Sequence, residues 1–170
     1  DGRKMSKSLG NIVAPQEVTE HSGAEILRLW VVASDYSEDL KIGPEILKHQ
    51  IDAYRRLRNT LRYLIGNLHG YEPAHAVPLA EMPELEHWVL HRLWLLDAHV
   101  RHCCETFDFH GLFRELYNFC TVDLSAFYFD IRKDCLYCDP TTSTTRRAAQ
   151  TVLAELFDCL TAWLAPILCF

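Results

Sequence analysis

The chain has 170 residues, of which 49% are hydrophobic and 24% charged, as in an ordinary globular domain with its own core. Its formal net charge of −6 excludes a generally basic nucleic-acid binder, so any RNA-binding surface must be a local basic row. No apolar run is long enough for a membrane span, and residues 1–4 do not begin a signal peptide. Seven scattered cysteines suggest reduced thiols, so we expect a cytoplasmic protein with no membrane contact.

The hydrophobic periodicity is helical almost throughout. Two short helices are predicted at 16–22 and 24–34. Four long amphipathic helices are also predicted. Three lie at 44–69, 84–106 and 109–132, and the fourth is capped by Thr142 or Ser143 and ends at 164. Short links between long helices predict an antiparallel bundle. We therefore expect an all-α fold in two parts, with a loop and small helical subdomain in residues 1–43 and a helical bundle in residues 44–170.

The same periodicity predicts which side chains form the core. In the helix predicted at 109–132, the apolar positions fall three or four residues apart and should point inward. These positions are Phe113, Leu116, Cys120, Leu124, Phe127 and Ile131. The four tryptophans, Trp30, Trp88, Trp94 and Trp163, fall mostly on apolar faces and are also predicted to lie in the core.

Two lysines and two serines alternate near the start of the chain, in Lys4-Met5-Ser6-Lys7-Ser8, with Gly2 and Gly10 on either side. Such a loop suits triphosphate binding, because ammonium groups stabilise the charge that develops on departing pyrophosphate. A glycine-flanked loop can also close over a nucleotide and reopen. It is not a Walker loop, since the Gly-x-x-x-x-Gly-Lys-Ser/Thr pattern is missing. The alternative is a solvated basic loop without function.

The string and its flanks, Gly2-Arg3 and Leu9-Gly10-Asn11, closely resemble the KMSKS loop of class I aminoacyl-tRNA synthetases. Residues 23–36 resemble the segment that follows this loop in the isoleucyl, valyl and leucyl group. Residues 54–62 and several strings between Asp108 and Asp134 resemble the isoleucyl-tRNA synthetase family specifically. The resemblance covers nearly the whole chain.

The resemblance implies a segment of an isoleucine-activating enzyme, from the KMSKS loop through most of the anticodon-binding domain, cut short at its C-terminal end. Such an enzyme uses ATP with Mg to join isoleucine to isoleucine tRNA. Lys4 and Lys7 are the implied catalytic residues, and the implied ATP-binding residues are Lys4, Met5, Ser6, Lys7 and Ser8. The His-Ile-Gly-His motif is missing, so we expect the chain to bind tRNA but not to be catalytic alone. We also expect it to be a monomer.

Arginines provide the local basic row that the overall charge requires. Arg55, Arg58 and Arg62 follow i, i+3, i+7 on the long helix, where Asp52 is the only acidic residue between positions 51 and 68. We predict that this row binds tRNA phosphates, the alternative being a solvated helix face. Arg146 and Arg147 are further candidates, because positive charge near a helix N-terminus is unfavourable without a partner.

Other functions stay open on the sequence alone. Cys135, Cys138, His87 and His91 would supply the four ligands of a zinc site, but nothing brings the two pairs together, so we expect no metal. The remaining alternatives are a valyl- or leucyl-tRNA synthetase segment and a helical scaffold without enzymatic function. Asn118-Phe119-Cys120 and the strings after it favour the isoleucyl family over the valyl and leucyl families.

Overall fold

The structure is a computed structural model that describes residues 3–170, so Gly2, which flanks the loop, lies outside the described residues. Within this range it contains helices and no strand, which confirms the all-α prediction. The α-helices are α1 (Pro15–Ser22), α2 (Ala24–Ala33), α3 (Pro44–Asn67), α4 (Glu84–Thr106), α5 (Phe109–Asn118), α6 (Phe129–Cys138) and α7 (Thr144–Leu164). Short 3₁₀ turns are η1 (Lys7–Leu9), η2 (Pro73–His75) and η3 (Leu79–Glu81), and a π-helical segment, η4 (Phe119–Tyr128), joins α5 to α6.

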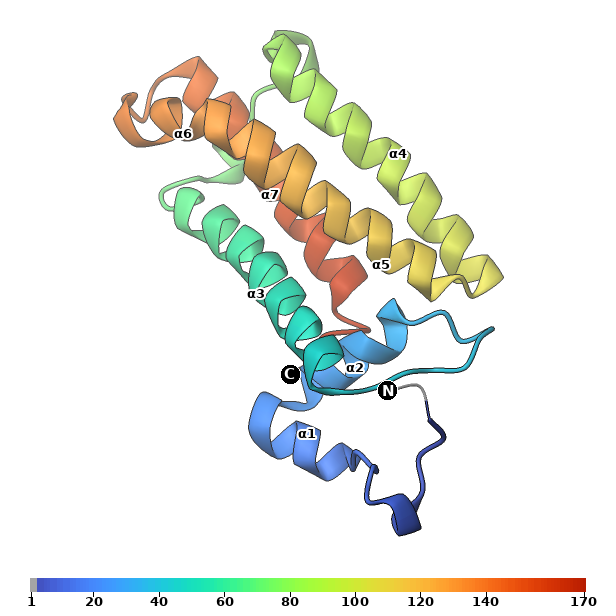
Figure 1. The fold of residues 1–170 in the computed structure, drawn as a ribbon. Coiled ribbons are helices and arrows are strands. Elements are labelled where there is room, and N and C mark those ends of the chain that lie inside the picture. Colours follow the sequence, from blue (N-terminus) through green and yellow to red (C-terminus); the bar gives the residue numbers. More distant parts are fainter. Residues whose placement is uncertain (1–2) are drawn as a thin grey trace.

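Four long rods form the bundle, and α5, η4 and α6 together make one of them (Figure 1). Local sequence sets where the rods begin. Pro44 occupies the first turn of α3, where its missing N–H costs no hydrogen bond. The N–H of Gly111 donates to Asp108 Oδ1 at 2.9 Å, so Asp108 caps α5. The N–H of Arg146 donates to Ser143 Oγ at 3.4 Å, so of the two residues predicted to cap α7 it is Ser143 that does so.

The π-helical segment corrects the prediction for the third long helix. In this segment the backbone bonds run from i to i+5, as from the N–H of Phe129 to the carbonyl of Leu124. The wider turn shifts the inward face, so Tyr128 and Phe129 are buried, while Phe127 and Ile131 are 44% and 47% exposed. The predicted inward positions of Phe127 and Ile131 are therefore wrong. The rod also continues to Cys138 instead of ending at Arg132.

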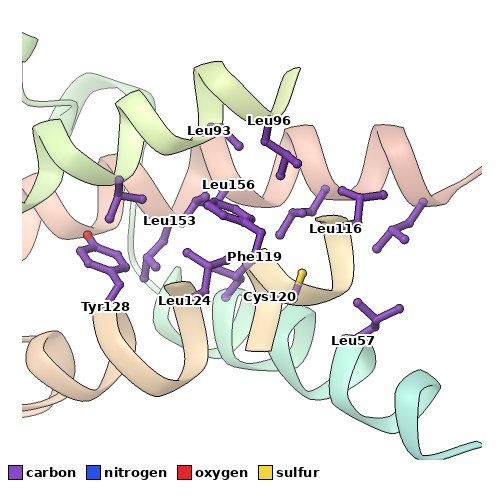
Figure 2. Packing of buried hydrophobic residues seen from close by; sticks show 14 of the residues in the cluster. Leu57, Leu93, Leu96, Leu116, Phe119, Cys120, Leu124, Tyr128, Leu153 and Leu156 are labelled. Atoms are coloured by element: carbon purple, nitrogen blue, oxygen red, sulfur yellow. The ribbon is translucent and has the colours of Figure 1, made fainter. Parts of the chain in front are cut away.

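The core lies where the four rods face one another (Figure 2). Leucines from α3, α4, α5 and α7 meet the aromatic rings of the π-helical rod there, as shown by Leu57, Leu96, Leu116, Leu156 and Phe119. The tryptophan prediction is wrong for Trp94, which is 65% exposed on α4 and stacks on His91. No helix within residues 3–170 combines the length and apolarity that crossing a bilayer requires.

The small helices α1 and α2 are fastened to one end of the bundle, and they carry the N-terminal loop (Figure 1). Ile26 and Leu29 of α2 are buried. The Arg28 guanidinium donates to the carbonyls of Pro166 and Ile167, both at 2.7 Å, which ties α2 to the segment after α7. His110 Nδ1 lies 2.7 Å from the carbonyl of Ala33. These contacts place the loop at the end of the bundle where α3 begins.

Candidate functional site

The lysine- and serine-rich loop forms a closed turn. The Asn11 side chain bridges it, since Oδ1 accepts from the N–H of Ser6 at 2.9 Å and Nδ2 donates to the carbonyl of Lys4 at 3.3 Å. Gly10 ends η1 in the left-handed region, with φ at 63°, and its N–H donates to the carbonyl of Lys7. Few residues other than glycine adopt this conformation readily. The turn thus depends on Gly10 and Asn11.

The side chains of the loop point to solvent. Lys4, Met5, Lys7 and Ser8 are exposed, and Ser6 is partly exposed. The hydroxyls of Ser6 and Ser8 lie 2.6 Å apart and share a hydrogen bond. Neither lysine makes an ion pair within residues 3–170, so both ammonium groups are available to an anion. The loop therefore offers two cations and two hydroxyl groups from one short turn, a donor set suited to a polyphosphate.

The predicted arginine row lies along α3. Arg55, Arg58 and Arg62 are all exposed, over a length of about 10 Å at the helical rise of 1.5 Å per residue. Arg55 makes a weak pair with Asp52 at 3.5 Å, with its side chain 70% exposed. Arg58 and Arg62 make no hydrogen bond or ion pair within the described chain. These three residues, the arginine row, present their guanidinium groups to solvent, and those of Arg58 and Arg62 are unpaired within residues 3–170.

Arg146 and Arg147 have structural partners that the sequence did not indicate. Arg146 Nη1 donates to the carbonyl of Asp139 at 2.6 Å, and Arg147 Nε donates to that of Thr141 at 3.1 Å. Both bonds satisfy carbonyls of the link after α6, which explains arginines at the start of α7. The two arginines also line a cavity of about 300 Å³ together with His69 and His75. The two arginines therefore stabilise the link between α6 and α7, and they place cationic groups at the end of the bundle where α7 begins.

A shallow groove with a volume of about 320 Å³ lies between α3 and the π-helical rod, and no sequence pattern indicated it. It is lined by Tyr63, Phe129 and Tyr137, together with Asn59 and polar groups of the rod. Asn59 is exposed on the α3 face that carries the arginine row. The sequence did place Tyr63 four residues after Asn59 on the arginine-rich helix α3. It could not show that Tyr137 of α6 lies beside them, because that depends on the fold.

The four residues considered as zinc ligands, Cys135, Cys138, His87 and His91, do not form a site. No group of three or more His, Cys, Asp or Glu side chains within residues 3–170 is arranged to hold a metal. His87 Nε2 instead lies 2.6 Å from the carbonyl of Leu79, and His91 stacks on Trp94. Cys135 and Cys138 are both free thiols on α6.

The cysteines are expected to differ sharply in reactivity. Burial raises the pKa of Cys120 to about 12, and it also raises the pKa of Cys103. The thiolate is the nucleophile, so only about one Cys120 in 10⁴ would be reactive at pH 8, even if a reagent reached it. We expect a maleimide to label exposed Cys104 and Cys138 in the native protein, and Cys120 only after unfolding. Peptide mass spectrometry checks this, and rapid native labelling of Cys120 would contradict the packing around it.

Comparison with known families gives two matches. The family described as "Anticodon-binding domain of tRNA ligase" matches residues 86–170. The family described as "tRNA synthetases class I (I, L, M and V)" matches residues 1–43. The two matched ranges contain most of the bundle and the whole lysine- and serine-rich loop.

Individual relatives agree with these matches. An isoleucine–tRNA ligase from Gluconobacter oxydans (strain 621H) is 58% identical over 169 residues, which are 99% of this chain and 18% of that protein. One from Ruegeria pomeroyi is 59% identical over 170 residues, 99% of this chain and 17% of that protein. The chain thus spans less than a fifth of the length of these curated relatives. Among solved structures, a LeuRS from Agrobacterium radiobacter K84 in a ternary complex with tRNA and LeuAMS has a TM-score of 0.70 over 98% of this chain and 20% of that chain. At 18% identity, it supports the fold alone.

Proposed function

The chain belongs to the family of class I tRNA ligases that carry the anticodon-binding domain, and we propose that it is the tRNA-binding part of an isoleucine–tRNA ligase. The predicted resemblance to isoleucyl-tRNA synthetases is confirmed by 54–59% identity to curated isoleucine–tRNA ligases over nearly the whole chain. In the proposal, residues 44–170 bind isoleucine tRNA, and residues 1–43 connect that domain to the site where isoleucine reacts with ATP in the cytoplasm.

The loop has the donors that adenylate formation requires. When the isoleucine carboxylate attacks the α-phosphate of ATP, negative charge develops on the departing pyrophosphate. Exposed Lys4 and Lys7 would stabilise that charge in the transition state, and Ser6 and Ser8 would donate hydrogen bonds to phosphate oxygens. We propose that ATP arrives as its Mg complex, with the metal held outside this chain. The Asn11 bridge keeps the turn closed, so less order has to be gained when ATP binds.

The observation that carries the tRNA-binding proposal is the arginine row. One strand of duplex DNA carries a phosphate about every 3.4 Å along the axis, and the spacing in RNA is of the same order. The row's length of about 10 Å is therefore on the order of the span of three phosphates. Unpaired guanidinium groups bind phosphate oxygens through two parallel hydrogen bonds. In a chain with a net charge of −6, three exposed arginines on one helix mark a local site for a polyanion.

Fluorescence anisotropy of the chain with three RNAs tests the proposal. The RNAs are isoleucine tRNA, the same tRNA with an exchanged anticodon, and an unrelated tRNA, each titrated at several salt concentrations. Tighter binding to isoleucine tRNA that is lost with the anticodon would assign recognition to this domain. Equal, salt-dependent binding of all three would assign it backbone contacts only. No binding at low salt would contradict the proposal and favour a helical scaffold.

We expect the double substitution Arg58→Ala and Arg62→Ala to weaken binding of all three tRNAs about tenfold or more, because two charge-assisted contacts are lost. The slope of log affinity against log salt should become shallower by about two, since each arginine releases about one counterion. Arg101→Ala is the matched control. Its guanidinium is also exposed on a long helix but already pairs with Asp97 at 2.7 Å. Equal effects of the two variants would contradict a specific role for the row.

A further inference from the structure

Glu25, in the first turn of α2, is a buried carboxylate with only one of its two oxygens bonded. The residue is 7% exposed. Its Oε1 accepts from the backbone N–H of Phe170 at 2.5 Å, whereas its buried Oε2 has no hydrogen-bond partner within residues 3–170. Glu25 also makes no ion pair in that part of the chain. Because a buried carboxylate oxygen without a donor is unfavourable, Oε2 indicates a partner that the described residues do not supply.

The backbone after α7 is held by α2 through two opposite charges, and the C-terminal end of the chain lies beside that helix (Figure 1). Arg28 donates to the carbonyls of Pro166 and Ile167, and three residues earlier Glu25 accepts from the N–H of Phe170. Residues three apart lie on the same helix face, so one face of α2 binds carbonyls with a cation and the next N–H with an anion. These bonds fix the direction in which the backbone passes Oε2.

The donor that fits Oε2 is a backbone N–H of the residues that follow Phe170. Phe170 delivers its own N–H to the other oxygen of the carboxylate, so the next amides along the chain are the closest in sequence. In an extended segment successive N–H groups point to opposite sides. In the first turn of a helix they point the same way and have no partner within their helix, and a negative charge there is favoured by the helix dipole. A helix N-terminus therefore suits Glu25 in both geometry and charge.

The link before such a helix would have an ordinary length. Helix α7 ends at Leu164, so residues 165–169 would separate it from a helix that begins at Phe170. Connections of about 2–8 residues are usual between the helices of a bundle, and Pro166 suits a position shortly after a helix end. The curated relatives are several times as long as this chain, which leaves room in a protein of their length for a further helix.

We propose that, in a ligase in which the chain continues past Phe170, Glu25 binds the N-terminus of a helix that begins at or just after Phe170. In this arrangement Oε1 keeps its bond to the N–H of Phe170, and Oε2 accepts from a following N–H. The proposal goes beyond tRNA binding, because it concerns the attachment of the next element of the protein. Since α2 belongs to the subdomain that carries the lysine- and serine-rich loop, the new helix would be fixed to the same subdomain as the loop.

Hydrogen exchange of a complete ligase that contains this segment, followed by peptide mass spectrometry, tests the attachment. Glu25→Gln keeps the size of the side chain and one acceptor oxygen but removes the charge and the second acceptor. We expect the amides just after Phe170 to be protected in the unsubstituted ligase. With Glu25→Gln they should exchange about 10- to 100-fold faster, the loss expected for a hydrogen bond to a charged group. Glu17→Gln is the matched control and should leave these amides unchanged, because Glu17 also lies in the first turn of a short helix, α1, but is exposed.

Three results would overturn the proposal. They are unprotected amides after Phe170 in the unsubstituted ligase, protection that Glu25→Gln leaves unchanged, and equal acceleration over the whole ligase, which would report a general loss of stability. In the 170-residue chain, Glu25→Gln should lower the urea midpoint no more than Glu17→Gln does, because glutamine still accepts from the N–H of Phe170 and removes a buried charge. A larger loss there would mean that the carboxylate acts within this chain, and would also contradict the proposal. Neither glutamate belongs to the arginine row, so tRNA binding stands or fails independently.

Discussion

Replacing Glu86 by alanine is expected to lower the free energy of unfolding by about 3–5 kcal/mol. Glu86 is fully buried in the first turn of α4 and accepts two hydrogen bonds from the Arg132 guanidinium, at 2.6 and 2.7 Å. The buried Tyr128 hydroxyl donates to the same carboxylate at 3.0 Å. Removing Glu86 would leave Arg132, only 15% exposed, without its counter-charge, and a buried hydroxyl without an acceptor.

The position of this pair makes the expected effect large. It joins the start of α4 to the rod that contains η4 and α6, so it fixes how the two rods pack. Burial, followed by the charge of Glu86, raises the pKa of Tyr128, which keeps its hydroxyl protonated as the donor. The pair also removes Arg132 from the surface, so this arginine is not available to RNA.

Urea unfolding followed by circular dichroism measures the effect, with the slope against urea expected to stay constant. Glu84→Ala is the matched control, because Glu84 begins the same helix but is exposed, and it should change stability by less than about 0.5 kcal/mol. Combining Glu86→Ala with Arg132→Met should recover part of the loss, since no unpaired charge remains buried. Similar stabilities of the Glu86 and Glu84 variants would contradict the network.

Sequence reasoning predicted the helices and much of the core, because amphipathic spacing is a local property. It failed where the geometry of the helix changes. A period of 3.6 residues places Phe127 and Ile131 inward, but the π-helical turn adds about one residue per turn and buries Tyr128 and Phe129 instead. The segment has no composition that distinguishes it from an ordinary helix, so only the packed structure reveals the change of register.

The candidate sites likewise divide into those that a local sequence pattern predicts and those that depend on the packing of distant helices. The loop and the arginine row are contiguous or periodic in sequence, so their side chains could be named before the fold was known. The Glu86–Arg132 pair and the groove join residues from different helices, which no local pattern connects. One signal was available for the pair. Glu86 stands at the head of the inward stripe Val89, Leu93 and Leu96, and a carboxylate at such a position requires a buried partner.

In a complete ligase that contains this segment, Lys7→Ala is expected to lower the rate of isoleucine-dependent ATP–pyrophosphate exchange about 100- to 1,000-fold. The Lys7 ammonium is exposed on the 3₁₀ turn η1 and makes no ion pair within residues 3–170, so it is free to contact a phosphate of the proposed nucleotide. Because charge on pyrophosphate grows as the bond to the α-phosphate breaks, the loss should appear mainly in kcat. The KM for ATP should change less.

Lys41→Ala is the matched control for Lys7, since Lys41 is an exposed lysine elsewhere in residues 1–43 and should leave exchange unchanged. The same Lys7→Ala substitution in the 170-residue chain should leave tRNA affinity intact, because the arginine row lies on α3 and not on the loop. The two measurements together would separate the two proposed functions, transition-state stabilisation at the N-terminal turn and RNA binding along the bundle. A raised KM with unchanged kcat would mean that Lys7 binds ATP equally in the ground and transition states, and would overturn its catalytic role.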